Sequence, residues 1–377
     1  METVLYIAKD TKSPSIIGKL AGIRRFCSSR GWEAQIVNRQ AFQTDELAGI
    51  LRERCPVGCV VDGVANDVNL PPRLFRGVPV SYIGYMRGRT GNLPNFHFNT
   101  AAIAEAAFKE LSAGAPPCYA AVAHPRPMRW SRQRVAAFCN LALASGAECR
   151  VFRQTDETQD GFVARLAPWL SALPAHCAVF AVSDAVAVLV ERAARLAMRH
   201  IPRSLTLVSV DNFAELCENA EPPISSIQLD FERMGFLAAR ALGEKNADRE
   251  PILVDPLMVV RRKSTSGSGR HEKFILDAVE IIRREACDGL TVRSLIDRFP
   301  QSRRNFERRF REAMGHSILD EILHVRLERV CTLLAQTDMP IGAIPDFCGF
   351  DCPRTLHALF QSRFHRSMRD WRKEKAR

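Results

Sequence analysis

The sequence predicts an α/β domain followed by a separate all-α domain. Short apolar runs alternate with helical patterns up to about residue 262, a Ser/Gly-rich stretch follows, and the rest has helical periodicity alone. A chain of 377 residues is also too long for one ordinary domain. We therefore expect residues 1–263 and 271–377 to fold separately, joined by a flexible linker at residues 264–270.

The first part contains repeated strand–loop–helix patterns. The predicted strands are residues 3–8, 33–37, 58–62, 79–83, 118–123, 179–183 and 205–211. The clearest helices between them are residues 16–29, 101–113, 133–144 and 185–199. This alternation predicts parallel sheets covered by helices. Asp62, Asp184 and Asp211 lie at strand ends, where ligands of open α/β sheets bind, although each could instead cap the following helix.

The second part contains two helix–turn–helix units. Its predicted helices are residues 271–285, 292–299, 303–314, 318–336, 341–348 and 353–364. The units at residues 290–315 and 341–364 are bridged by the amphipathic helix at residues 318–336. Two units held by one helix can occupy two successive segments of the DNA major groove.

The stretch SRRNFERRFREAMG at residues 302–315 is the strongest candidate for a DNA-reading helix. Phe306, Phe310 and Met314 form one apolar stripe, and Gly315 is a typical helix stop. The side chains expected to contact DNA are Arg303, Arg304, Asn305, Arg308 and Arg311. Arginine pairs with guanine or phosphate, and asparagine pairs with adenine. The alternative is a solvated basic helix.

The second unit offers a smaller polar set. Arg354, His357 and Gln361 are expected to face the groove, whereas Leu356 and Phe360 belong to the core. Pro345 lies inside the preceding predicted helix, where proline is expected to distort the backbone. We therefore expect the helix at residues 303–314 to read most of the bases.

Charge supports a polyanionic partner. The net charge is +11, and residues 270–377 carry 21 lysines and arginines, 18 of them arginine, against 16 acidic residues. Residues 1–9 do not read as a signal peptide, and no apolar run is long enough to span a membrane. The 12 scattered cysteines indicate reduced thiols, so we expect a cytoplasmic protein with no membrane partner. No cysteine pair has companions for a zinc site, and we expect no metal and no cofactor.

The helical part resembles the DNA-binding domain of the AraC/XylS family of transcription regulators. The resemblance covers about residues 271–373. The segments that carry it are SRRNFERRFREAMG at 302–315, RLERVCTLLAQTDMPIGAIPDFCGF at 326–350 and FQSRFHRSMRDWR at 360–372. The resemblance implies a double helix-turn-helix domain that binds a double-stranded DNA operator.

Residues 3–262 resemble the periplasmic-binding-protein-like sensor domain of the LacI/GalR regulators. The matching segments include TAAIAEAAFKEL at 100–111, RWSRQRVAAF at 129–138, FAVSDAVA at 180–187 and PRSLTLVSVDN at 202–212. The combined arrangement is similar to the xylose-operon regulator subgroup of the AraC family. It implies two α/β lobes with a ligand cleft between them.

The resemblance also implies the residues of a sugar site. Arg134 would face sugar hydroxyls, Trp130 would stack on the ring, Asp184 and Asp211 would accept hydroxyl donors, and Asn212 is a further candidate. The alternatives are a helix-start salt bridge for Arg134, core packing for Trp130 and a helix N-cap for Asp184.

These patterns together predict a ligand-responsive, sequence-specific DNA-binding transcription regulator. We expect a homodimer that senses a monosaccharide and controls carbohydrate-use genes, with RNA polymerase as a further partner and no enzymatic activity. The loop at residues 9–15 and Asn99 depart from the xylose-type pattern, so another metabolite is an alternative ligand. A transporter-associated sugar-binding protein is a second alternative, and a thiol-chemistry sensor using Cys348 or Cys352 is a third.

Overall fold

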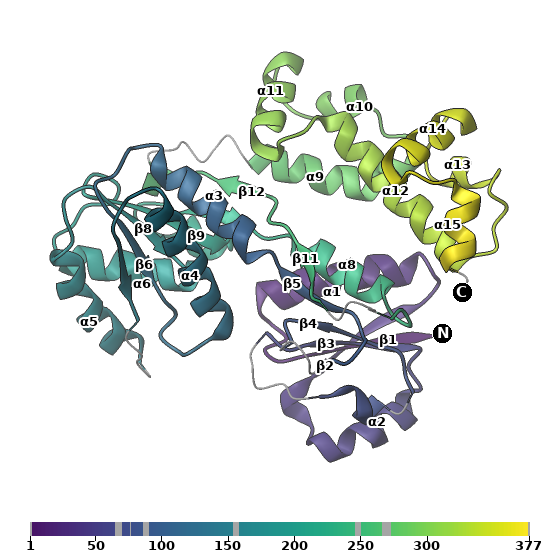
Figure 1. The fold of residues 1–377 in the computed structure, drawn as a ribbon, viewed down its shortest axis with the longest axis horizontal. Helices are drawn as coiled ribbons and strands as arrows, with labels where there is room; N and C mark the ends of the chain where they lie inside the picture. Colours follow the sequence, from purple (N-terminus) through teal and green to yellow (C-terminus); the bar gives the residue numbers. More distant parts are fainter. Residues whose placement is uncertain are drawn as a thin grey trace. The chain divides into compact units, whose positions relative to one another are not determined.

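The computed structural model describes residues 2–64, 70–75, 77–85, 90–153, 158–245, 250–265 and 273–375. The chain divides into two compact units, Met1–Gly269 and Arg270–Arg377. The first is α/β and the second is all-α, as the sequence predicts (Figure 1). Within the described ranges, no helix combines the length and the apolar character needed to cross a membrane.

The first unit contains two six-stranded sheets, each the centre of one lobe (Figure 1). The first sheet has the order β11-β5-β4-β3-β1-β2, and its paired strands are parallel. Its strands are β1 (Thr3–Ala8), β2 (Glu33–Asn38), β3 (Gly58–Asp62), β4 (Val80–Ile83), β5 (Asn95–Phe98) and β11 (Ile252–Val254). The apolar runs of β1 and β3 lie wholly in the core, as expected of strands with helices on both faces.

The second sheet has the order β12-β10-β9-β8-β6-β7. Its strands are β6 (Tyr119–Val122), β7 (Cys149–Phe152), β8 (Cys177–Ala181), β9 (Leu205–Asp211), β10 (Ser225–Gln228) and β12 (Met258–Val260). β12 pairs antiparallel with β10, and the other pairs are parallel. The last two strands of the unit are therefore edge strands, β11 in the first sheet and β12 in the second.

Helices cover both sheets. Those of the first lobe are α1 (Pro14–Ser28), α2 (Leu47–Arg54) and α8 (Phe231–Arg240). Those of the second are α3 (Thr100–Ser112), α4 (Arg129–Ala144), α5 (Gln159–Ser171), α6 (Asp184–Leu196) and α7 (Ala214–Cys217). α1 and α8 touch backbone to backbone, because a Cβ on Gly22 or Gly235 would overlap a carbonyl oxygen of the other helix.

Three crossings join the lobes, at β5–α3, β10–α8 and β11–β12. Asn99 lies at the first crossing, and its side-chain oxygen accepts a hydrogen bond from the amide of Ala102 and so caps α3. Its side-chain amide donates to Asp255 at the third crossing over 2.7 Å. The first and third crossings are therefore tied together.

The first two residues of the predicted linker are hydrogen-bonded to the first unit. Ser264 lies in a 3-10 turn, η4 (Lys263–Thr265), where its hydroxyl donates to the carbonyl of Leu207 and accepts the amide of Ser225. Thr265 donates to Glu110 over 3.0 Å. Residues 264 and 265 therefore belong to the first unit, and residues 266–270 of the predicted linker lie outside the described residues.

The second unit consists of helices joined by short turns. They are α9 (Lys273–Glu285), α10 (Val292–Ile296), α11 (Arg303–Met314), α12 (Ile318–Gln336), α13 (Ile344–Phe347), α14 (Pro353–Phe364) and α15 (Met368–Lys375). Phe306 and Phe310 pack in one half, and Leu356 and Phe360 pack in the other, all fully buried. α12 bridges the two helix–turn–helix units, as predicted.

Pro345 does not lie deep in a helix. α13 begins at Ile344, so the proline occupies its first turn, where a missing N–H costs little. The structure shortens the predicted helix rather than bending it. The prediction that Pro345 distorts a helix of the second unit is therefore wrong.

Candidate functional site

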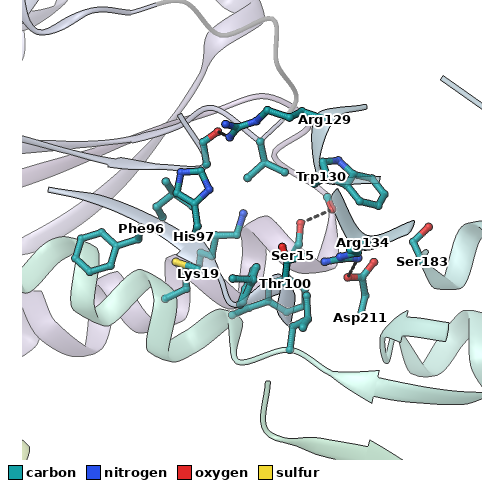
Figure 2. Close-up of a pocket in the computed structure, with 18 of the residues that line it drawn as sticks. Ser15, Lys19, Phe96, His97, Thr100, Arg129, Trp130, Arg134, Ser183 and Asp211 are labelled. Atoms are coloured by element: carbon teal, nitrogen blue, oxygen red, sulfur yellow. Dashed lines mark hydrogen bonds and ion pairs between the residues drawn. The ribbon is translucent and has the colours of Figure 1, made fainter. Parts of the chain in front are cut away.

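The first unit encloses a cavity of about 370 Å³ that is lined from both lobes. The loop after β1 contributes from the first lobe together with α1, β4, β5 and α8. The second lobe contributes through α3, α4, the start of α6 and the end of β9. Figure 2 shows the polar side chains converging on this space. A pocket between two lobes is the usual place for a small-molecule ligand.

Arg134, Trp130 and Asp211 come together on the second-lobe wall (Figure 2). The buried Arg134 guanidinium donates to the carbonyl of Val182 over 2.7 Å and lies 3.6 Å from the Asp211 carboxylate. Its Cζ lies 4.9 Å from the centre of the Trp130 ring. Arg134 therefore forms a salt bridge and lines the cavity at the same time, because its partner Asp211 lines the cavity as well.

Asp211 has a strained backbone conformation and a raised pKa. It ends β9 with φ of 108°, in the left-handed region that side chains rarely adopt. Burial raises the pKa of Asp211 to about 7, the charge of Asp184 adds to that rise, and Arg134 and Lys19 oppose it. A carboxyl group that titrates near neutral pH can accept a ligand hydroxyl in one protonation state and donate to it in the other.

Lys19 and Asp62 form a buried ion pair on the first-lobe wall. Lys19 Nζ lies 2.5 Å from Asp62 Oδ2, which also accepts the Tyr6 hydroxyl over 2.8 Å. Lys19 is 1% exposed and lines the cavity. The sequence analysis missed it, although a lysine within the apolar face formed by Ile16, Leu20 and Ile23 is a usable signal.

Arg129 spans the two lobes. It starts α4 in the second lobe, and its Nη2 donates to the first-lobe carbonyls of Gly84 over 3.0 Å and Tyr85 over 3.2 Å (Figure 2). His97 Nε2 lies 2.9 Å from the same Tyr85 oxygen. Burial and the charge of Arg129 lower the pKa of His97 to about 4, so the ring is neutral at pH 7 and donates to that carbonyl. Neither Arg129 nor His97 is predicted as a ligand contact from the sequence.

The loop after β1 and a set of aromatic rings complete the lining. Ser13 and Ser15 line the cavity, and their hydroxyl oxygens lie 3.1 Å apart. Phe231 packs edge-on against Phe98 and stacks with Phe213, with centroids 5.4 and 5.8 Å apart. The aromatic surface therefore comes from the crossings and from β9–α7, rather than from the loop at residues 9–15.

Asp184 and Asn212 do not line the cavity. Asp184 is fully buried, and its carboxylate accepts the hydroxyls of Ser209 and Ser226 and the amide of Phe213. Asn212 donates to Gln228 and accepts from Arg262. Both side chains are occupied in holding the second lobe together, and the structure does not support them as ligand contacts.

In the second unit, the five predicted side chains of α11 lie on its accessible faces. Arg303 forms an ion pair with Glu307 over 2.8 Å, and Arg308 pairs with Glu312 and donates to Asn305. Arg304 and Arg311 are exposed. Ion pairs on an exposed surface contribute little, so DNA phosphates can compete for these guanidinium groups.

The α14 residues Arg354, His357 and Gln361 are exposed at spacings of three and four, which places them on one face of the helix. Cys348 is buried, and burial raises its pKa to about 12, so it is not an activated thiol. Cys352 is exposed at the start of α14, where the backbone amides of Thr355 and Arg354 lower its pKa.

Comparisons with known proteins agree with this architecture. A periplasmic binding protein-like domain matches residues 118–265, and a helix-turn-helix domain matches residues 295–374. The xylose operon regulatory protein of Escherichia coli K12 is 26% identical over 307 residues, which cover 78% of each chain. That of Haemophilus influenzae is 28% identical over 64% of this chain, and the match spans 65% of its own length.

Solved structures share the fold. The xylose-binding transcription activator xylR has a TM-score of 0.58 at 23% identity, with 99% of this chain and 98% of that chain covered. The transcriptional regulator CelR, in complex with cellobiose, has a TM-score of 0.58 at 24% identity over 70% of this chain and 84% of its own. A dimeric Lac repressor has a TM-score of 0.55 at 14% identity over 70% of this chain and 98% of its own. The chain is a homologue of the xylose operon regulatory proteins and combines a periplasmic-binding-protein-like domain with a helix-turn-helix domain of the AraC type.

Proposed function

We propose that this chain is a sugar-responsive transcription regulator that binds operator DNA through its second unit and a monosaccharide in the cavity of its first. One observation carries the proposal: a cavity lined from two lobes stands in the same chain as two helix–turn–helix units with exposed arginines. The proposed ligand contacts are Arg134, Asp211 and Trp130, and Lys19 and Arg129 join them.

The chemistry of the lining suits a polyhydroxylated molecule. Sugars present pairs of hydroxyls and an apolar ring face. A sugar site therefore needs carboxylate or guanidinium groups that bind the hydroxyls and an aromatic ring that stacks on the apolar face. The cavity offers the Arg134–Asp211 pair and the Trp130 ring on one wall. On the other it offers serine hydroxyls and the ammonium group of Lys19, whose ion-pair partner Asp62 lies outside the lining. Its volume of about 370 Å³ lies at the small end of the range for ligand pockets, which favours a monosaccharide over a longer saccharide.

The proposed mechanism is closure of the two lobes on the ligand. A sugar that contacts Lys19 and Arg134 together binds the closed form better than the open form, and only such differential affinity shifts the equilibrium. In a homodimer, closure changes the spacing of the two DNA-binding units. We propose Arg303, Arg304, Asn305, Arg308 and Arg311 of α11 and Arg354, His357 and Gln361 of α14 as the DNA contacts.

We propose that the protein acts in the cytoplasm, where its operator lies, and that it has no catalytic activity. Contact with RNA polymerase belongs to the same proposal. The chemistry of the site supports binding: the charged groups of Lys19 and Arg134 already have carboxylate partners, an arrangement that orients hydroxyls.

A panel of monosaccharides tests the proposal. Thermal unfolding of the full chain is followed with each sugar, and gel shifts with operator fragments are run with and without the stabilising sugar. We expect one sugar to raise the unfolding temperature and to change operator affinity. Trp130→Leu is expected to abolish the shift, whereas Trp169→Leu, a matched change on α5 outside the cavity lining, is expected to keep it. A full panel without any thermal shift contradicts the proposal.

A further inference from the structure

Two half-buried cysteines lie in contact near the edge of the second lobe. Cys139 is on α4, and Cys149 begins β7, the edge strand of its sheet. Their sulfur atoms are 2.8 Å apart. A disulfide has an S–S distance of about 2.05 Å, so a small movement would bring the two sulfurs into bonding distance. Both residues are free thiols in the structure.

We propose that Cys139 and Cys149 form an oxidisable dithiol that closes to a disulfide on exposure to peroxide and reopens with a thiol reductant. The pair is reachable, since both residues are partly exposed and β7 lies at the end of the strand order formed by the described residues. Neither cysteine is among the proposed sugar or DNA contacts.

The two sulfurs are electrostatically unequal. The hydrogen bond shared with Cys149 and the charge of Arg153 lower the pKa of Cys139. The same hydrogen bond raises the pKa of Cys149, and burial adds to the rise. Because the thiolate is the nucleophile, Cys139 attacks the oxidant and Cys149 resolves the product.

The chemistry balances with one peroxide. The Cys139 sulfur attacks one oxygen of hydrogen peroxide, the O–O bond breaks, and the departing hydroxide takes the Cys139 proton as water, leaving a sulfenic acid. The Cys149 sulfur then attacks the Cys139 sulfur, the S–O bond breaks, and the Cys149 proton leaves with the hydroxyl as a second water. Two thiols lose two electrons, and one peroxide is reduced to two waters.

The disulfide would join α4 to β7. α4 also carries Arg129, Trp130 and Arg134, and so the bond would fix the helix that supplies one wall of the cavity. A second close pair, Cys118 and Cys177, has sulfurs 2.7 Å apart on β6 and β8. Both of its members are buried in the core, and we expect it to react far more slowly.

The test uses the full chain with Cys55→Ser and Cys352→Ser, which removes the two exposed thiols. The protein is treated with hydrogen peroxide, alkylated after denaturation, digested without reduction and analysed by mass spectrometry. We expect a Cys139–Cys149 cross-linked peptide that disappears after reduction. In a Cys149→Ser variant, dimedone is expected to trap a sulfenic acid at Cys139, about tenfold faster than any adduct at Cys217.

The mobility of α4 provides a second readout. Amide exchange of α4 is expected to slow in the oxidised protein and to be unchanged by peroxide in the Cys139→Ser variant. Full alkylation of both cysteines after peroxide treatment would overturn the inference. So would a cross-link confined to Cys118 and Cys177, or equal dimedone labelling of Cys139 and Cys217.

Discussion

Arg129 provides the sharpest test of lobe closure. Its guanidinium donates two hydrogen bonds from the second lobe to backbone carbonyls of the first, and opening the cleft separates these partners. Arg129→Met removes both bonds and keeps much of the side-chain volume. Hydrogen bonds from a charged donor contribute about 1.5–3 kcal/mol each when sheltered. Arg129 is only partly buried, so we take about 1–3 kcal/mol for the pair.

That energy is removed from the closed form alone. Because the ligand binds the closed form, we expect its affinity to fall roughly 5- to 150-fold, measured by isothermal titration with the sugar identified in the thermal panel. Arg129→Lys is the matched control: it keeps the charge and can reach one carbonyl, so its loss is expected to be smaller. Small-angle scattering of the free protein should show a larger radius of gyration for Arg129→Met. Wild-type affinity and wild-type radius in that variant would refute the reasoning.

Four further measurements test the DNA-binding helix, the Asp211 carboxyl group and the attachment of α3. Arg304→Ala should weaken operator binding by about 1–3 kcal/mol in a gel shift if a base contact is lost. Arg303→Ala should have a similar effect, and it also removes the ion pair with Glu307. Asp211 with a pKa of about 7 implies sugar affinity roughly tenfold higher at pH 8 than at pH 6 if its carboxylate accepts a hydroxyl, and Asp211→Asn should remove that dependence in titrations. Because that pKa is raised, the stability that Asp211 contributes is present at acid pH and is lost as pH rises from about 4 to 7, so thermal unfolding of wild type and Asp211→Asn should diverge in that window. Glu110→Gln should leave sugar affinity intact but reduce the effect of sugar on operator binding, because it weakens the attachment of Arg261.

Much of the fold could be predicted because its long elements have clear periodicity. β1, β3 and β9 are apolar runs of five to seven residues, and α11 and α12 have well-marked ends. Two strands of four residues, β4 and β6, could also be predicted from compact apolar runs. The other strands of three or four residues, β5, β7, β10, β11 and β12, could not, since so few positions do not distinguish a strand from a loop. The edge strands β11 and β12 owe their existence to pairing with strands far away in the sequence.

Some residues of the cavity lining could be predicted from the sequence, and others could not. Trp130, Arg134 and Asp211 stand at positions where the resemblance implies a ligand contact, and the structure brings them together. The burial of Lys19 depends on Asp62, 43 residues away, and the pairing cannot be read from local pattern. Arg129 bonds to backbone carbonyls, which have no side-chain signature.

Asp184 shows the opposite case, because it is predicted as a ligand contact from its strand-end position but does not line the cavity. A carboxylate at the end of a strand is a sound candidate for a ligand contact until the neighbouring strands are placed. Pairing of β9 with β10 brings the hydroxyls of Ser209 and Ser226 onto its Oδ1, and the amide of Phe213 onto its Oδ2. A buried carboxylate with three donors is satisfied within the protein, so it has little capacity left for a ligand.

The position of α3 indicates how closure could reach the connection to the DNA-binding unit. Asn99 caps the start of this helix at the lobe crossing and bonds to Asp255, so a change in lobe angle acts directly on that end. Near the other end, the buried Glu110 accepts Arg261 over 2.7 Å and Thr265 over 3.0 Å. A flexible linker transmits force poorly, but here the chain is held to α3 as far as residue 265. A movement of α3 would therefore shift the point from which the connection to the second unit departs, and the Glu110→Gln variant separates this route from a purely spacing-based one.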